Sequence, residues 1–503
     1  MILVVNFGGQ YAHLIARKVR DLGVYSEIIP YTKASYEEVN TRRPAGIILS
    51  GGPSSVYEPN SPSLDPRLLD MGLPILGICY GFQLIVKLLG GEVRRGKGEF
   101  GPTEVQLVEE DELLMGWDGG LVWMSHSDFV SKLPDDLIVT SVSENGYVSS
   151  FKHKRKPIYG VQFHPEVKHT QGGIKILENF LKIARAERDW DTERILSMIE
   201  DYLIEEVSKC SKVLVAVSGG VDSTLSALLV SRVAKGKLVP VFVNHGLLRK
   251  GEPESVVSSL RKIGIDVIYV DASKEFLEAL RGVRGCEEKR AIVGELFAKI
   301  FMDIFERENC DCLVQGTLYP DVIESGAEVG ADRIKSHHNV AGLPSWFKGR
   351  VIEPLRYLYK DEVRRLARRL GVPEEIVSKH PFPGPGLSVR IIGEITEEKL
   401  DIVREASSIV EDALRERGLY DKVWQAFAVI GEDRWVGIKG DARVDGYIVT
   451  VRVVESEDAM TADWFRLDQE TLEELSKRIS AIPQVSMITY AITTKPPSTI
   501  EPC

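Results

Sequence analysis

The chain has 503 residues, of which 44% are hydrophobic and 27% charged. That length suits about three folded domains with ample core, so a single small binding module and a disordered chain are both excluded. The net charge of −11, from 63 basic and 74 acidic residues, disfavours a general nucleic-acid-binding protein.

The first third of the chain alternates apolar runs with glycine-rich turns. The runs at 2–5, 46–49 and 73–78 are typical of buried strands, and each is followed by such a turn. This rhythm predicts a parallel sheet with crossover helices. A charged stretch at 184–190 indicates a connector, and a helix is expected over 193–207.

A second rhythm of the same kind begins at 212. Strands are expected at 212–217, 238–243, 266–270 and 312–314, with helices between them. A Pro/Gly cluster at 380–387 interrupts it. A helix at 396–417, strands at 423–429 and 447–454, a helix at 468–479 and a strand at 486–492 then predict a small α+β domain. The expected fold class is therefore two consecutive parallel-sheet α/β domains, 1–187 and 188–381, followed by an α+β domain at 382–503.

The six cysteines, at 79, 210, 286, 310, 312 and 503, form no dense framework and no common zinc spacing. They indicate a reducing, cytosolic setting, so we expect a cytoplasmic protein. The sequence starts on a strand-like run without the features of a secretory signal, and no apolar run approaches 18 residues. We therefore expect no membrane partner.

Cys79 lies between an apolar run and a helical pattern, flanked by Gly77 and Gly81. This pattern predicts a strand–turn–helix elbow that presents the thiol at a helix N-terminus, where a thiolate is stabilised. The segment around His164 reads as extended, so Glu166, two residues on, would face the same side and orient that base.

The backbone N–H groups of Tyr80 and Gly52 are candidate oxyanion donors for this thiol. Cys79 or His164 alone would more often be a core residue. The elbow, the glycines and the His-x-Glu spacing together favour catalysis.

These residues resemble the class I glutamine amidotransferase domain. The resemblance implies that Cys79 forms a thioester with glutamine and releases ammonia, with His164 as base and Glu166 as its orienting partner. It also places Gln83, Ser125, His126 and Ser127 at the glutamine.

A second cluster, Ser218-Gly219-Gly220-Val221-Asp222-Ser223, lies between a strand pattern and the helix expected at 224–233. Its backbone N–H groups and hydroxyls would cradle phosphate at a helix N-terminus. Asp222 would repel phosphate unless a cation intervened, which predicts Mg²⁺ at Asp222. The P-loop pattern of ordinary phosphate-transfer enzymes does not occur. A plain strand–helix loop is the alternative.

This loop resembles the pyrophosphate-binding loop of the N-type ATP pyrophosphatases. The resemblance implies ATP cleavage between the α and β phosphates, with Val243 at the adenine.

The order of the domains resembles the glutamine-hydrolysing GMP synthetase family over essentially the whole chain. That resemblance implies amination of xanthosine 5′-monophosphate (XMP) to GMP through an adenyl-XMP intermediate, with ATP, Mg²⁺ and glutamine, and a homodimer formed by the third domain. Lys335, His337 and His338 would form a lid over the phosphates. The implied XMP-binding residues are Arg290, Asp321, Glu324, Gly384, Gly386, Lys495, Thr499, Ile500 and Glu501.

Blander interpretations remain for three of these segments. The histidine pair could bind a metal, although it lacks the i,i+4 helix spacing. Asp321 and Glu324 could be a solvated charge pair, and the Lys495 segment a loose tail.

The chain departs from the family pattern at three places. Gly285-Cys286 stands where the family commonly has Asp-Pro, Pro502-Cys503 stands where it often has Trp, and Ser127-Asp128 stands where it often has Gly-Asp. None of these removes a predicted catalytic group.

Three rival functions are weaker. Another amidotransferase would lack the Ser218–Ser223 loop, and a tRNA-modifying pyrophosphatase would need a basic surface or sulfur-carrying cysteines. A glutamine-sensing regulator with decayed sites would have lost Cys79, His164, Glu166 or Asp222, all of which are present.

Overall fold

The computed structural model describes residues 1–324, 349–456 and 461–503, with the side chains of 323 and 324 left undescribed. The chain divides into two compact units, the first being Met1–Ile195 and the second beginning at Leu196. The helix α5 (Thr192–Ser208) contains the division point.

A nine-stranded sheet forms the first unit, in the order β2-β1-β3-β4-β9-β8-β7-β5-β6. The first five of these are parallel: β2 (Ser26–Pro30), β1 (Ile2–Asn6), β3 (Gly46–Leu49), β4 (Ile75–Ile78) and β9 (Ile158–Val161). Because β3 and β4 are buried at every position, they appear in the sequence as continuous apolar runs. The helices are α1 (Ala12–Asp21), α2 (Tyr36–Arg42), α3 (Tyr80–Leu88) and α4 (Gly173–Ile183).

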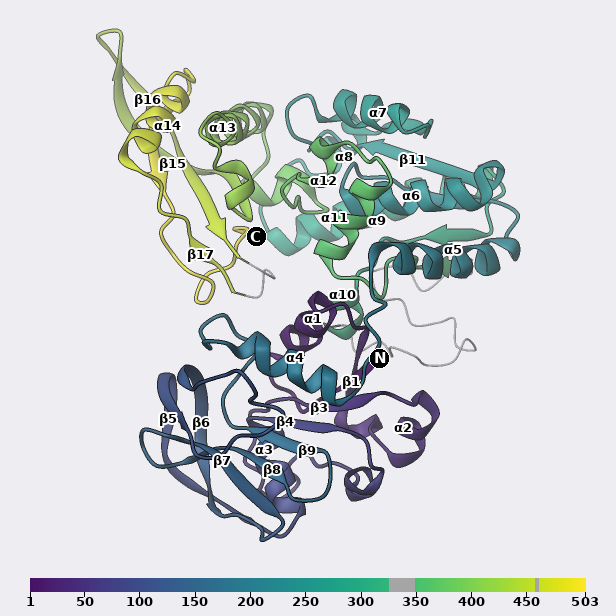
Figure 1. Ribbon diagram of the computed structural model, residues 1–503. Helices are drawn as coiled ribbons and strands as arrows, with labels where there is room; N and C mark the ends of the chain where they lie inside the picture. Colours follow the sequence, from purple (N-terminus) through teal and green to yellow (C-terminus); the bar gives the residue numbers. More distant parts are fainter. Residues whose placement is uncertain (325–348, 457–460) are drawn as a thin grey trace. The chain divides into compact units, whose positions relative to one another are not determined.

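The remaining four strands of this sheet run antiparallel and were not predicted. They are β8 (Val148–His153), β7 (Leu137–Ser143), β5 (Glu92–Leu107) and β6 (Gly120–Lys132). Figure 1 shows β5 and β6 beside one another at one side of the first unit. Buried and more exposed residues alternate along β6, which is typical of a strand with one open face. The predicted parallel sheet is therefore correct for its central strands and incomplete beyond β9.

The second unit begins with a five-stranded parallel sheet in the order β12-β11-β10-β13-β14. The strands are β10 (Val213–Ala216), β11 (Leu238–Asn244), β12 (Ile268–Asp271), β13 (Cys312–Val314) and β14 (Arg350–Ile352). Strand order reverses at β10, and ligands of such sheets bind at the carboxyl end of that point. The accompanying helices are α6 (Val221–Ala234), α7 (Glu252–Lys262), α8 (Ser273–Ala279), α9 (Cys286–Arg307), α10 (Tyr319–Glu324), α11 (Lys360–Arg369) and α12 (Glu374–Val377).

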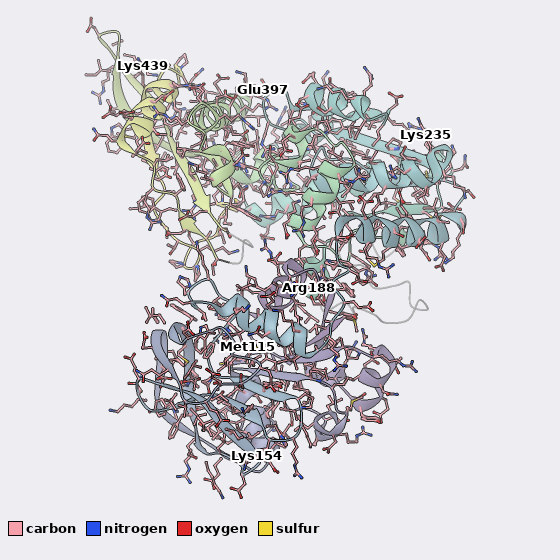
Figure 2. The ribbon with its side chains drawn as sticks, in the orientation of Figure 1. Met115, Lys154, Arg188, Lys235, Glu397 and Lys439 are labelled. Atoms are coloured by element: carbon pink, nitrogen blue, oxygen red, sulfur yellow. A yellow bond between two sulfur atoms is a disulfide. The ribbon has the colours of Figure 1, made fainter. Side chains whose placement is uncertain are left out.

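A four-stranded mixed sheet follows in the same unit. The strands β15 (Gln425–Lys439) and β16 (Ala442–Glu455) form an antiparallel hairpin, β17 (Asp463–Trp464) pairs with β16, and β18 (Val485–Tyr490) runs parallel to β16. Helices α13 (Glu397–Glu416) and α14 (Gln469–Ser480) complete the predicted α+β arrangement. The hairpin is longer than expected. Figure 2 labels Lys439, the last residue of β15. Its amino group donates to the carbonyls of Ser480 and Ile482 at 2.8 and 2.6 Å.

One hydrophobic core runs through the whole second unit. It includes Val241 of the parallel sheet, Leu387 after the Pro/Gly cluster, Val403 of α13 and Val451 of the mixed sheet. The Pro/Gly cluster therefore ends one sheet pattern without interrupting the packing.

The cysteine pattern predicted a reducing setting with no disulfide framework, but four of the six cysteines are paired. Cys210 bonds to Cys312, 102 residues away, and Cys286 bonds to Cys503, 217 residues away, while Cys79 and Cys310 are free. Pairings at such separations leave no local spacing signal. Among the described helices, none is long and apolar enough to cross a membrane.

Candidate functional site

Cys79 occupies a sharp turn between β4 and α3. Its backbone has φ +53° and ψ −101°, a conformation that side-chain-bearing residues rarely adopt. A Cβ at Gly77 would lie 2.6 Å from the carbonyl group of Gly81, and a Cβ at Gly81 would lie 2.5 Å from the carbonyl oxygen of Leu49. Both glycines are therefore required for the turn, and α3 begins immediately after Cys79, with its N-terminus beside the thiol.

His164 and Glu166 form a buried pair beside this thiol. They follow β9 in a turn, so the predicted extended segment is wrong, but His164 Nδ1 and Glu166 Oε1 lie 2.7 Å apart. A Cβ at Gly51 would lie 3.1 Å from His164 Cε1 and 3.7 Å from Cys79 Cβ, so this glycine borders both side chains. Burial lowers the pKa of His164, but the charges of Glu166 and Cys79 and hydrogen bonds to both raise it well above its ordinary value.

The predicted oxyanion donors border the same turn. Tyr80 is the first residue of α3, and a Cβ at Gly52 would lie 3.3 Å from the Tyr80 ring and 2.9 Å from the Phe7 carbonyl oxygen. The thiol of Cys79 approaches the carbonyl oxygen of Ser125 at 3.7 Å.

Two of the predicted glutamine-binding side chains are engaged inside the protein. Gln83 donates through Nε2 to the Asp128 carbonyl and to Gln162, both at 3.0 Å. His126 Nε2 lies 3.0 Å from Glu99, and His126 Nδ1 lies 2.8 Å from the Asp128 carbonyl. On β6, the exposed Ser125 and Ser127 lie on either side of the buried His126. Gln83 and His126 thus hold the strand that presents the two serines.

The Ser218–Ser223 loop follows β10 and leads into α6. The backbone N–H of Ser218 donates to Ser223 Oγ, and the two hydroxyl oxygens lie 3.1 Å apart. Gly219 has φ +81°, and a Cβ there would lie 2.3 Å from the Val256 side chain, so no other residue fits. The loop borders a pocket of about 440 Å³ whose apolar lining includes Phe242, Val243 and Phe297.

Asp222 faces this pocket with one carboxylate oxygen occupied and one free. Its Oδ2 accepts from Lys360 Nζ at 2.5 Å, whereas its buried Oδ1 has no hydrogen-bond partner within the described residues. A buried carboxylate oxygen beside a phosphate-sized cradle suits Mg²⁺, which prefers oxygen ligands. The chain therefore fits the predicted ion.

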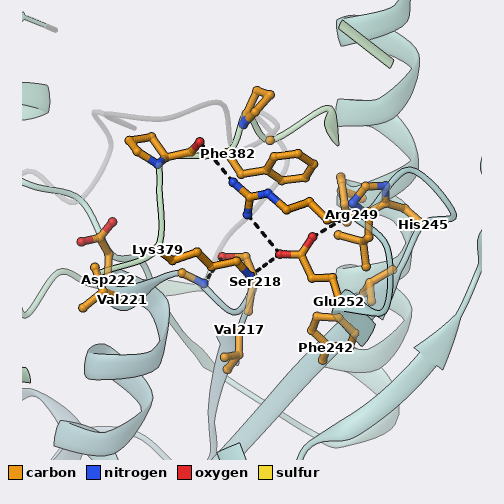
Figure 3. A pocket seen from close by; sticks show the side chains of 18 of the residues that line it. Val217, Ser218, Val221, Asp222, Phe242, His245, Arg249, Glu252, Lys379 and Phe382 are labelled. Carbon is orange, nitrogen blue, oxygen red and sulfur yellow. Dashed lines mark hydrogen bonds and ion pairs between the residues drawn. The ribbon is translucent and has the colours of Figure 1, made fainter. Parts of the chain in front are cut away.

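The pocket also carries a network of charged side chains around Glu252 and Arg249 (Figure 3). Lys379 pairs with Glu252, and Arg249 Nη2 donates to the His380 carbonyl at 3.1 Å. Burial raises the pKa of Glu252, but Lys379 and Arg249 reverse this and lower it. Arg249 also lies over the Phe382 ring at 4.3 Å. The pocket thus combines an apolar floor with fixed charge.

Several predicted XMP-binding residues gather near the end of the chain. Glu501 accepts two hydrogen bonds from Arg390 and one from Gln425, while Thr499 Oγ1 donates to the Glu501 carbonyl at 2.5 Å. Arg290 donates to the carbonyl of Cys503. Lys495 pairs through its backbone with Ala462, and Ile500 lies between Thr499 and Glu501.

The remaining predicted XMP and lid residues are more dispersed. Gly384 lines the pocket, and Gly386 has φ +63°, with a Cβ there only 2.4 Å from the Leu247 carbonyl oxygen. Asp321 instead accepts from the Leu318 backbone N–H at 2.9 Å, at the start of α10. The side chain of Glu324 and the residues Lys335, His337 and His338 lie outside the described part of the chain.

Two family models and several known proteins match this chain. A family model described as glutamine amidotransferase class-I matches residues 3–184, and one described as GMP synthase C terminal domain matches residues 412–502. A glutamine-hydrolysing GMP synthase of Pyrobaculum aerophilum is 58% identical over 100% of this chain and 99% of its own. Proteins with the same description from Symbiobacterium thermophilum and Thermus thermophilus are 50% and 49% identical, again over 100% of this chain and over 98% and 100% of their own.

The chain belongs to the glutamine-hydrolysing GMP synthase family. The resemblance predicted from the sequence is thereby confirmed, as is the α/β fold class. In this member of the family, the sequence analysis missed Lys360, Arg390, Gln425, Arg249 and Glu252. Each is a single polar residue without a spacing pattern, and only the folded chain brings it to a pocket or to Glu501.

Proposed function

We propose that this chain makes GMP from XMP, using ATP and the amide nitrogen of glutamine. The division of labour we propose assigns glutamine hydrolysis to residues 1–187, adenylation to 188–381, and dimerisation with part of the XMP site to 382–503. The observation that carries the proposal is the presence, in one chain of this family, of both the Cys79–His164–Glu166 arrangement and the Ser218–Ser223 cradle.

In the proposed glutaminase step, the Cys79 sulfur attacks the amide carbon of glutamine. The N–H groups of Tyr80 and Gly52 would stabilise the oxyanion, and Gln83, Ser125, His126 and Ser127 would bind or frame the substrate. His164 takes the proton of the Cys79 thiol, is stabilised as a cation by Glu166, and gives this proton to the departing ammonia. Water then hydrolyses the thioester, releasing glutamate and the thiol.

In the proposed synthetase step, the ATP phosphates occupy the cradle and the adenine lies near Val243. Mg²⁺ held by Asp222 would offset the repulsion between this carboxylate and the phosphates. The xanthine 2-oxygen attacks the α-phosphorus and pyrophosphate leaves. Ammonia then attacks C2 and AMP leaves, giving GMP.

We assign the XMP contacts to the residues that the family pattern supplies, namely Arg290, Asp321, Glu324, Gly384, Gly386, Lys495, Thr499, Ile500 and Glu501. Lys335, His337 and His338 are proposed as the lid over the phosphates. Support comes from the gathering of Thr499, Glu501 and Arg290 at the end of the chain.

We further propose a homodimer in the cytoplasm, formed through the third domain. Three large apolar side chains of β15, Trp435, Val436 and Ile438, are 52%, 48% and 78% exposed, which supports a partner on this hairpin. The disulfides are compatible with this location, because intracellular proteins of some hyperthermophiles are rich in disulfides.

In the decisive experiment, the protein is incubated with XMP, ATP and Mg²⁺ and with either glutamine or ammonium as the nitrogen donor. The products GMP, AMP and pyrophosphate are then measured. We expect the unsubstituted protein to use both donors and Cys79→Ala to use only ammonium. Cys310→Ala, which removes the other free and buried cysteine, is the matched control and should use both. Absence of GMP with ammonium in all three proteins would refute the proposed substrate.

A further inference from the structure

Two of the departures from the family pattern lie next to each other in the fold. Cys286, which stands where the family commonly has Pro, is the first residue of α9, and Cys503 belongs to the altered end of the chain. Their sulfur atoms form a disulfide that closes a span of 217 residues. Two changes that look unrelated in the sequence are therefore one covalent link.

The segment 491–503, here called the tail, is tied to the body of the second unit by a few specific contacts. Arg452 donates to the carbonyl of Thr493 at 2.6 Å and to that of Thr499 at 3.3 Å. Beyond Thr499, the side chain of Glu501 reaches Arg390 and Gln425. The disulfide lies two residues beyond Glu501 and fixes the last stretch from its far side.

The same link joins the tail to a predicted substrate contact. Arg290 lies one turn of α9 after Cys286, and its guanidinium donates to the carbonyl of Cys503. After reduction of the disulfide, this hydrogen bond would still join α9 to Cys503. The position of Arg290 relative to Thr499 and Glu501 is thus fixed covalently in the oxidised chain.

We propose that the Cys286–Cys503 disulfide positions the tail for XMP binding, so that XMP affinity depends on the redox state of this pair. This inference rests on the proposed function and adds redox regulation to its XMP site. A dithiol supplies the two electrons and two protons: the Cys286–Cys503 S–S bond breaks, two thiols form on the protein, and the dithiol closes into its own disulfide. The ATP pocket is lined by other residues, so its affinity for ATP is independent of the link.

The second disulfide provides a matched control within the same unit. Cys210 lies before β10 and Cys312 is the first residue of β13, so this bond joins the chain beside the parallel sheet and touches no residue of the tail. Opening it removes a disulfide from the second unit without releasing Cys503.

The test uses the full chain with ammonium as nitrogen donor, so that the Cys79 thiol is not needed. We expect Cys286→Ser and Cys503→Ser each to raise the KM for XMP roughly 3- to 10-fold, the factor by which ordering one or two side chains costs affinity, with the KM for ATP unchanged. The double variant Cys210→Ser/Cys312→Ser should keep the original KM for XMP. Dithiothreitol should raise that KM in the unsubstituted protein and in this control, and should leave Cys286→Ser unaffected.

Peptide mapping of the disulfides identifies which bond has opened in each sample. An unchanged KM for XMP in both single variants, or an equal rise in the KM for ATP, would overturn the positioning role. If one single variant fails to fold, the other variant and the reversible reduction of the unsubstituted protein still show whether the disulfide sets the KM for XMP. Failure of the oxidised protein to convert XMP at all would instead refute the proposed function.

Discussion

Arg390 and Glu501 form a two-point ion pair, with Nε to Oε2 at 3.1 Å and Nη2 to Oε1 at 2.8 Å. The Arg390 side chain is 1% exposed and lies over the rings of Phe427 and Phe382, at 4.1 and 5.1 Å. A guanidinium buried to this degree needs a carboxylate partner. The tail is therefore part of the folded unit and not a loose end.

Glu501→Gln should destabilise the second unit by about 3 kcal/mol, because it leaves the buried guanidinium of Arg390 without a countercharge. Urea unfolding monitored in that unit measures the loss. Arg390→Met/Glu501→Leu, which removes both charges, should recover most of the stability. A double variant as unstable as Glu501→Gln would contradict this account.

Glu166→Gln should lose stability in a pH-dependent way. The pKa of His164 is raised in the folded chain, so its stabilising contribution is complete below the ordinary value of about 6.5 and is lost as the pH rises through the raised pKa. Without the carboxylate, only Cys79 opposes the burial that lowers the pKa of His164, so the pKa should fall.

The deficit of Glu166→Gln should therefore be largest near pH 5 to 6, at about 3 kcal/mol, and should shrink at higher pH. Urea unfolding at a series of pH values measures it. The exposed Glu187→Gln is the control and should show a small, flat difference. A deficit for Glu166→Gln that grows with pH would oppose the assigned direction of the pKa.

Asp222→Asn should lower ammonium-dependent GMP formation by about 100-fold, because it removes the charged oxygen that suits Mg²⁺. Calorimetric titration with ATP in the presence and absence of Mg²⁺ separates ion binding from turnover, and the variant should lose the Mg²⁺-dependent gain in affinity. Its glutaminase activity should persist. Full Mg²⁺ dependence in Asp222→Asn would assign the ion elsewhere.

Gly81→Ala should destabilise the first unit by about 1 to 3 kcal/mol and remove glutaminase activity, because its Cβ would lie 2.5 Å from the Leu49 carbonyl oxygen. Gly294→Ala is the opposite case. This exposed position in α9 has nothing within 4 Å of the added Cβ, and alanine should stabilise the helix by about 1 kcal/mol. Thermal unfolding of both variants tests the pair, and equal effects would contradict it.

The sequence predicted the parts of the fold that depend on continuous apolar runs. The residues 46–49 and 312–314 form strands with the expected bounds, and every residue in them is buried, so both faces of each strand are apolar. The antiparallel strands β5 and β6 escaped notice because their buried residues are separated by more exposed ones and form no continuous apolar run. Their role as strands depends on pairing with each other and with β7.

The candidate site also contains residues that the sequence predicted and residues that it did not. Cys79 and Asp222 were predicted because glycines and hydroxyls at fixed spacing surround them. Lys360 and Arg390 were not, because each meets its partner across more than a hundred residues of sequence and has no local signature. The disulfide partners were missed for the same reason. The functional roles of the site residues stay predictions that the experiments above address.

At position 79, the positive φ favours glycine, whereas the proposed chemistry requires a thiol side chain. Any residue with a Cβ pays about 1 to 2 kcal/mol there, and glycine pays least. Cys79→Gly should therefore be more stable than Cys79→Ala, although the proposed mechanism predicts that both are inert toward glutamine. A population of variants enriched for thermal resistance alone should drift toward glycine at position 79, and under the proposed mechanism it would lose ammonia production as it did so.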